Sequence, residues 1–482
     1  MHLDSSPRPL RVLLLTACVA AWALAGLLCL DPAPLLAPSH AQDKAAAPLA
    51  PGKYLGASAC DGAQCHGKPE ARPEPPYLTE YVSWSAMNGD VPYDRHSYAW
   101  KRLRGSAQGG DDRSPEMMDK LNALEGTKDK AEQSERCLTC HGVSVHDYGV
   151  GKKNPGAAVA KHKALQGARY KNEEGVSCDG CHGPAEKWLK AHDKPGWAEK
   201  KWEELGGKSG GSQKLYDQFG IYYSKDLELW ADQCVRCHLR IDTNLLEAGH
   251  PDLLAFELFG HNQQVPHWRP YAFSEGKASL PASGKSHPAS TWAVGQAVCV
   301  RSAIEQLGER AAGAHHNKAT PEYLTAAQRR LASHWIALRS GLKTLSPAAV
   351  EPLEQAIAPL VAEGAEAGAL AEGCKKALEL ARPLARTLSD AAIDKAQVVA
   401  ILKALAADQA GYADATRAEL LMKSMYTLAY ARLMYVNPDT LFAETPDDAL
   451  LQAVFKMFES TDPASESFKQ GLAKAREALA KE

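Results

Sequence analysis

The stretch GVSCDGCHGPAEKWLKAH, residues 175–192, carries two cysteines three positions apart and a histidine directly after the second. C-x-x-C-H is the sequence signature of c-type haem attachment. Two thiols add to the two vinyl groups of a haem, and the adjacent histidine is then held against the iron as its proximal ligand. The stretch therefore predicts that Cys178 and Cys181 bind a haem covalently, with His182 as an iron ligand.

The same pattern occurs four times in the chain. A disulfide, a redox C-x-x-C or a zinc ribbon would not require a histidine directly after each pair. We therefore predict four covalently bound haem c groups, each with its iron. The first site has four residues between its cysteines instead of two, so its spacer has to bulge. The attachment cysteines with their histidines are Cys60, Cys65 and His66; Cys137, Cys140 and His141; Cys178, Cys181 and His182; and Cys234, Cys237 and His238.

The segment around these motifs, residues 54–290, is rich in Gly and Pro and shows no sustained amphipathic period. Haems are large flat apolar bodies, and in such a segment they would supply the core, with tryptophan and tyrosine rings packed against them. We therefore expect a loop-rich tetrahaem domain over residues 54–290 that does not fold without haem.

The group on the far side of each iron decides between electron transfer and ligand chemistry. Pro184 suits the first turn of a helix, and a helix over the next residues would carry His192 about 15 Å from His182. Two ligands of one iron lie much closer together. We therefore expect His192, if it is a ligand, to serve a neighbouring haem, the alternative being a solvent-facing histidine.

Other histidines compete for the remaining axial positions. His96 and His250 are good candidates, and a surface position is again the alternative. For a fourth position we prefer His146 narrowly over His162. The weaker candidates are His261, His267 and His287. The basic side chains that could pair with haem propionates, or simply form a solvated face, are Lys101, Arg102 and Arg104.

The N-terminus is typical of an export signal. Arg8 and Arg11 precede a charge-free apolar run over residues 12–30, and a small-residue cleavage site follows near Ala41. We expect a signal peptide over residues 1–41 and a Pro/Ala-rich linker over residues 42–53, so that the mature protein is periplasmic or otherwise exported. The apolar run is nearly long enough to span a bilayer, so an uncleaved membrane anchor is the alternative.

Residues 291–482 differ in character. Ala, Leu, Glu and Lys dominate, and apolar residues recur at helical spacing. Breaks are expected at Ser346–Pro347, Arg382–Pro383, Asn437–Pro438 and Thr445–Pro446. Cys299 and Cys374 are single cysteines here and are interpreted as small buried hydrophobes. The predicted fold class is mainly α, with a loop-rich multihaem cytochrome domain followed by an α-helical bundle.

The order of the motifs, YLGASACDGAQCH, RCLTCHG, GVSCDGCHGPAEKWLKAH and QCVRCHLRIDTNLLEAGHP, resembles the tetrahaem cytochrome c-554 family of electron carriers. The resemblance covers about two-fifths of the chain, from Tyr54 to Phe259. It implies closely stacked haems with mostly bis-histidine ligation, and distal roles for His192, His250 and His96. The spacing of the first site departs from the family, and the helical C-terminal region lies outside it.

The sequence predicts an exported tetrahaem cytochrome that carries electrons between a donor and an acceptor protein, without catalytic acid or base residues. A net charge of −3 does not favour nucleic-acid binding. One alternative is a multihaem oxidoreductase with one open haem that acts on small nitrogen or sulfur oxides. A second is a membrane-anchored quinol dehydrogenase, and a third is a non-redox structural or interaction module. The helical region is expected to serve docking or oligomerisation.

Overall fold

The computed structural model describes residues 52–70, 78–108, 110, 112–143, 165–194, 196–262, 288–436 and 448–482. These residues belong to one compact unit, Ala46–Glu482. The expected signal, nearly all of the expected linker, and His146, His162, His267 and His287 lie outside the described residues. Within the part of the chain that is described, no helix is both long and apolar enough to cross a membrane.

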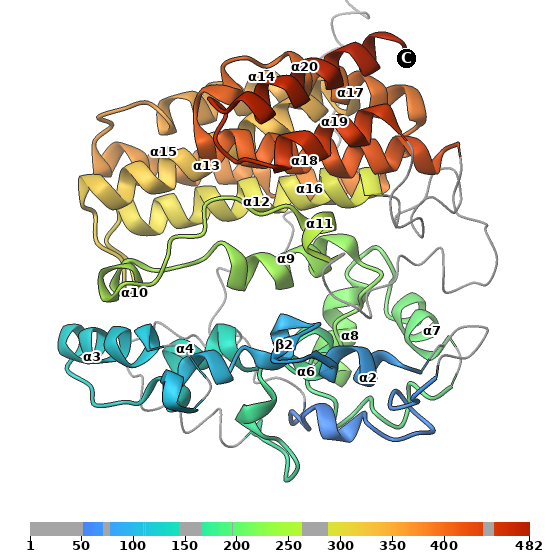
Figure 1. The fold of residues 1–482 in the computed structure, drawn as a ribbon. Helices are drawn as coiled ribbons and strands as arrows, with labels where there is room; N and C mark the ends of the chain where they lie inside the picture. Colours follow the sequence, from blue (N-terminus) through green and yellow to red (C-terminus); the bar gives the residue numbers. More distant parts are fainter. Residues whose placement is uncertain are drawn as a thin grey trace, which may run out of the picture. The chain divides into compact units, whose positions relative to one another are not determined.

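The fold is mainly α, as predicted. The C-terminal part is a bundle of long helices, coloured yellow to red in Figure 1. The breaks predicted at Ser346–Pro347 and Arg382–Pro383 are confirmed, and the other two lie outside the described residues. The helices are α12 (Pro288–Ala311), α13 (Pro321–Leu345), α14 (Pro347–Ile357), α15 (Ala367–Ala381), α16 (Leu384–Asp390), α17 (Lys395–Ala407), α18 (Ala415–Met434), α19 (Ala449–Phe458) and α20 (Glu466–Ala480).

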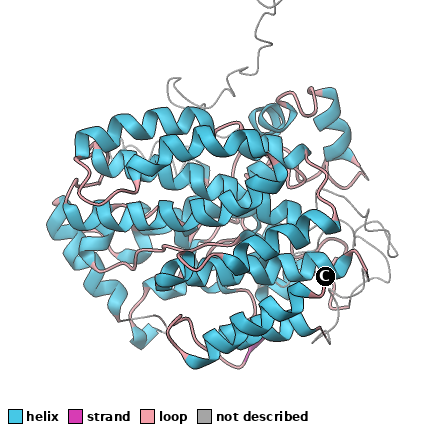
Figure 2. Ribbon diagram, turned by 90° about the horizontal axis from the view of Figure 1, so that it is seen from above, coloured by secondary structure: helices cyan, strands magenta, loops and turns pink. Residues whose placement is uncertain are grey.

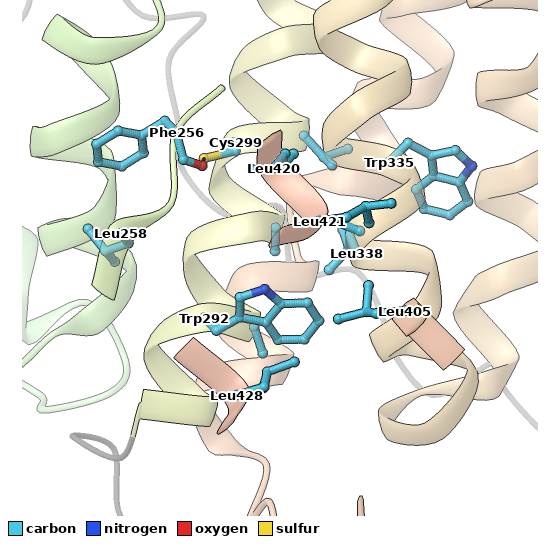
Figure 3. Close-up of a cluster of buried hydrophobic side chains, with 14 of the residues drawn as sticks. Phe256, Leu258, Trp292, Cys299, Trp335, Leu338, Leu405, Leu420, Leu421 and Leu428 are labelled. Carbon is cyan, nitrogen blue, oxygen red and sulfur yellow. Dashed lines mark hydrogen bonds between the residues drawn. The ribbon is translucent and has the colours of Figure 1, made fainter. Parts of the chain in front are cut away.

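The main hydrophobic core lies within this bundle. Figure 3 shows its centre, where Trp292 of α12 lies among leucines of α13, α17 and α18. Gly341 allows α13 to approach α12, because a Cβ at this position would lie 2.7 Å from the Trp292 ring. Cys299 and Cys374 are both buried apolar side chains, as predicted.

The N-terminal part, blue to green in Figure 1, consists of short helices joined by loops and 3-10 turns. Figure 2 shows that helix predominates over the described residues. A two-stranded antiparallel pair, β1 (Met87–Asn88) and β2 (Val91–Pro92), is the only strand pairing among the described elements. The helices are α2 (Glu80–Ser85), α3 (Arg113–Glu125), α4 (Glu135–His141), α6 (Cys178–His182), α7 (Trp197–Glu204), α8 (Gly211–Phe219), α9 (Leu227–His238), α10 (Thr243–Ala248) and α11 (Leu258–Asn262).

Two N-terminal helices, α9 and α11, join the core of the bundle, and α11 contributes Leu258 and Phe259. The buried residues Leu227, Ala231 and Val235 of α9 belong to the same hydrophobic cluster as Trp292. The expected boundary after residue 290 falls within α12, whose first turn is fully buried. The physical reason is that the apolar face of α9 needs a partner, and α12 provides it. Motif-bearing and motif-free segments therefore share one core.

A buried histidine in the bundle predicts a pH dependence of stability. His334 of α13 is fully buried, and its Nδ1 lies 2.9 Å from Gln296 Oε1. Burial lowers the pKa of His334 to about 3 from the ordinary 6.5. The unfolded chain therefore binds a proton that the folded chain does not, between these two pH values. Stability is fully present above pH 6.5 and is expected to fall with acid, by at most about 1.4 kcal/mol per pH unit.

The measurement is chemical unfolding at a series of pH values between 6.5 and 3. His334→Gln should flatten the slope of unfolding free energy against pH. His315→Asn is the matched control, because His315 is exposed and has a left-handed backbone that asparagine tolerates. Equal slopes in wild type and His334→Gln would contradict the prediction.

Candidate haem-attachment site

Three of the four motifs end a helix. His141, His182 and His238 are the last residues of α4, α6 and α9. In a helix, residues i, i+3 and i+4 lie on one face. Both thiols and the imidazole of each motif therefore point the same way, as attachment of one planar group requires.

The first motif reaches a similar arrangement without a helix. Residues 60–66 form a turn in which Cys65 N donates to Gly62 O at 2.8 Å. His66 N donates to Cys60 O at 3.2 Å. In a helical C-x-x-C-H the histidine N–H meets the carbonyl of the first cysteine in the same way, because the two are four residues apart. The two extra residues are thus looped out, and the histidine returns to the first cysteine.

Thiols of different motifs contact one another. Cys60 and Cys178 share a hydrogen bond, which lowers the pKa of Cys60 and raises that of Cys178. Cys140 and Cys237 share another, and Cys181 is a near neighbour of Cys234. The attachment points therefore follow the spatial order first, third, fourth, second motif. Burial raises the pKa of Cys181 to about 12.

Two carboxylates that no sequence pattern singled out bind the first motif to the third. Asp179, between the cysteines of the third motif, accepts from Leu55 N at 2.8 Å and Gly56 N at 2.6 Å. Glu174 accepts from Ala57 N at 2.6 Å. Burial raises the pKa of Asp179 to about 7. Together the two side chains hold the backbone that leads into Cys60.

Removing the Asp179 carboxylate should weaken the junction between the first and third motifs. Asp179→Ala is expected to lower the free energy of unfolding by about 2–4 kcal/mol, because two backbone N–H groups lose their acceptor. Asp179→Asn keeps an oxygen acceptor and should cost less than half as much. Chemical unfolding followed by circular dichroism measures both. Equal losses in the two variants would show that the hydrogen bonds are unimportant.

Histidines from different parts of the chain meet in pairs. The ring centres of His66 and His192 lie 6.0 Å apart, and those of His96 and His238 lie 6.2 Å apart. Two metal–imidazole bonds of roughly 2 Å, plus the distance from each nitrogen to its ring centre, add up to roughly 6 Å. The spacing of both pairs therefore fits an iron held between two imidazoles.

The other ring nitrogen of these histidines is engaged. A ligand histidine typically donates its second N–H to a carboxylate or carbonyl, which fixes its orientation and frees Nε2 for the metal. The Nδ1 contacts are His66 to Glu80 Oε2 at 2.8 Å, His96 to Asp94 Oδ1 at 2.9 Å, His141 to Ala99 O at 3.0 Å, His250 to Pro251 O at 2.9 Å, and His192 to Leu189 O. Five imidazoles thus have the tautomer that an iron ligand needs.

The carboxylate partners also change the basicity of two of these rings. The hydrogen bond that His66 donates to Glu80 raises the pKa of His66. Burial lowers the pKa of His96, but the hydrogen bond and charge of Asp94 outweigh it, so the net pKa is raised. A more basic imidazole is a stronger metal ligand.

The segment after the third motif is not the regular helix that we predicted. Residues 185–193 form successive turns, with Leu189 N bonded to Ala185 O at 2.8 Å and His192 N to Trp188 O at 3.0 Å. Gly183 precedes it in a left-handed conformation, φ +85°, which interrupts helical continuity from α6. Local helical bonds are still enough to carry His192 away from His182 and against His66.

The fourth motif has several aromatic neighbours. His238 stacks on Phe256, with ring centres 5.0 Å apart, and meets His261 edge-on at 5.6 Å. Burial lowers the pKa of His261 to about 4. His261, expected only as a weaker candidate, therefore lies beside the His96–His238 pair. The third motif's His182 faces the Trp230 ring at 6.2 Å.

Two of the three basic residues after His96 lie over aromatic rings. Lys101 lies over the Tyr98 ring, 5.0 Å from its centre, and Arg104 lies over the Trp100 ring at 5.5 Å. Among the described residues, no group of three or more His, Cys, Asp or Glu side chains is arranged to hold a bare metal ion.

No family model, curated protein or solved structure matches this chain.

Proposed function

We propose that this chain is an exported tetrahaem c-type cytochrome that transfers electrons between a donor and an acceptor protein. The observation that carries the proposal is the combination of four cysteine–histidine motifs with histidine pairs about 6 Å apart. A bound haem would supply an iron that alternates between the ferric and ferrous states. The resemblance to the cytochrome c-554 family belongs to the same proposal.

The chain's residues have distinct tasks in this proposal. The eight motif cysteines would anchor the haems, and the motif histidines would hold one axial position of each iron. His192 would occupy the second position opposite His66, and His96 the second position opposite His238. For the iron on His141 we propose His250. The hydrogen-bond partners at Nδ1 leave each Nε2 free for the metal. Electron transfer through the haems needs no proton shuttle and no catalytic acid.

The arrangement of the attachment points supports transfer rather than isolated redox centres. The contacts of Cys60 with Cys178 and of Cys140 with Cys237 place neighbouring motifs side by side. Asp179 and Glu174 keep the first and third motifs together. The attachment points form a row with the first and second motifs at its ends. One redox partner would exchange electrons at each end of this row.

The test is a redox titration of the protein purified from its native host, followed by visible and paramagnetic resonance spectra and by intact mass. Four covalent haems, predominantly low-spin, and stepwise reversible reduction are expected. A colourless protein with the mass of its amino acids alone would disprove the proposal. A high-spin haem that binds nitric oxide or cyanide would favour the oxidoreductase. A mature N-terminus near Gln42 would remove the membrane-anchored quinol dehydrogenase.

A further inference from the structure

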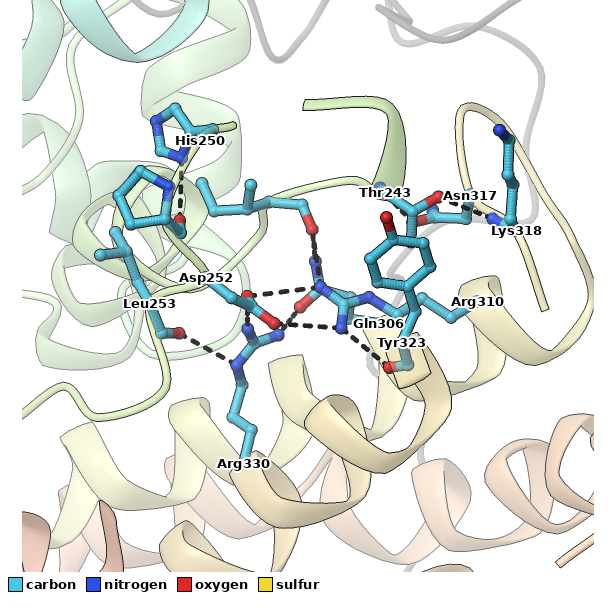
Figure 4. A network of polar contacts seen from close by, with 12 residues as sticks. Thr243, His250, Asp252, Leu253, Gln306, Arg310, Asn317, Lys318, Tyr323 and Arg330 are labelled. Atoms are coloured by element: carbon cyan, nitrogen blue, oxygen red, sulfur yellow. Dashed lines mark hydrogen bonds and ion pairs between the residues drawn. The ribbon is translucent and has the colours of Figure 1, made fainter. Parts of the chain in front are cut away.

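Two buried arginines of the bundle share one carboxylate that lies outside it (Figure 4). Arg310 of α12 and Arg330 of α13 are both fully buried, and each pairs with Asp252. Arg310 Nη1 lies 3.2 Å from Asp252 Oδ2, and Arg330 Nη2 contacts Asp252 Oδ1. Buried guanidinium groups are costly unless they are paired and their donors are used, so the position of Asp252 is strongly restrained.

Each of the two arginines also donates to a backbone carbonyl on one side of α10. Arg310 Nη2 donates to Ile241 O at 2.9 Å, and Arg330 Nε donates to Leu253 O at 3.1 Å. The planar guanidinium fork suits such divergent contacts, which a lysine could not reproduce. The two side chains thus fasten both ends of the segment 241–253 to the bundle.

That segment carries His250 and packs against the second motif. Leu245 and Ala248 of α10 lie in one hydrophobic cluster with Leu138 of α4. His250 N donates to Leu245 O at 2.9 Å, after Gly249 has turned the chain in a left-handed conformation. His250 thus follows directly on the helix that packs against α4, and α4 ends at His141.

We infer that Asp252, Arg310 and Arg330 are positioning residues that keep His250 where it would bind the iron held by His141. The inference rests on the proposed function. Only Pro251, whose ring fixes its φ angle, separates His250 from Asp252. A shift of the Asp252 carboxylate is therefore transmitted to His250. The helical bundle would then help to position a ligand of the haem at the second motif, in addition to any role in docking.

The decisive variant is Asp252→Asn in the full, haem-loaded protein. It keeps the shape of the side chain but weakens the pairing with both arginines. One of the four haems should change from low-spin to high-spin in its ferric resonance spectrum. The haem-to-protein ratio should stay the same, because no attachment cysteine is altered. Glu354→Gln is the matched control: Glu354 pairs with Arg339 at 3.1 Å but only joins α14 to α13, so all four haems should keep their spin states.

His250→Ala should produce the same high-spin signal, and the double variant should show no more of it than either single one. Added imidazole should restore the low-spin spectrum in all three. If His250→Ala gives the signal and Asp252→Asn does not, the positioning role is disproved. The inference also fails if neither variant changes the spectrum. Should Asp252→Asn not accumulate, Arg330→Lys is judged by the same criteria. Failure of the proposed function would be visible earlier, as wild-type protein without haem.

Discussion

The chain produced without haem attachment should lose ordered structure between residues 54 and 226 while the bundle stays folded. The buried clusters of this region are small; the largest has six buried residues here, among them Trp100, Leu121 and Leu138. The bundle, by contrast, has a continuous core that includes α9. Without porphyrin surface to bury, the N-terminal segments cannot offset their conformational entropy.

Hydrogen exchange followed by mass spectrometry measures this for each segment. Backbone amides before residue 226 should exchange at least ~100-fold faster than in the haem-loaded protein, which corresponds to about 3 kcal/mol less protection. Amides of α12 and α13 should keep their protection. Equal protection of both regions in the colourless chain would show that the small protein clusters are sufficient for folding.

Replacing both cysteines of the third motif should have a larger effect than replacing those of the first. Cys178→Ser/Cys181→Ser is expected to reduce the haem count from four to three. Cys178 touches Cys60, and Cys181 lies near Cys234, so this motif has neighbours on two sides. The loss should therefore shift the reduction potentials of two remaining haems and lower thermal stability.

Intact mass and redox titration measure both effects. Cys60→Ser/Cys65→Ser is the comparison, because it also removes one haem but lies at one end of the row and should shift one neighbour only. Cys299→Ala and Cys374→Ala, at buried cysteines of the bundle, should retain four haems. Identical shifts from the first and third motifs would contradict the spatial order.

The sequence predicted what depends on local spacing. The i, i+3, i+4 geometry of Cys178, Cys181 and His182 follows from the motif, because the helix places them on one face. The ends of α13 and α15 follow from Pro347 and Pro383 in the same way. Both rest on backbone rules that act within a few residues.

What the sequence did not predict depends on contacts between distant segments. The pairing of His66 with His192, and of His96 with His238, joins residues more than a hundred positions apart. Asp179 was part of a recognised motif, yet nothing local distinguishes a carboxylate that binds two remote amides from a solvated one. The ion pair between Arg310 and Asp252 could not be predicted for the same reason.

The junction between the first and third motifs has a consequence for biogenesis. Ala57 and Glu174 are 117 residues apart, and Gly56 and Asp179 are 123 apart. In the export that we propose, Cys60 and Cys65 would emerge well before Glu174 and Asp179. Haem attachment at the lengthened spacer would then have to take place before these carboxylates can hold the backbone that leads into Cys60.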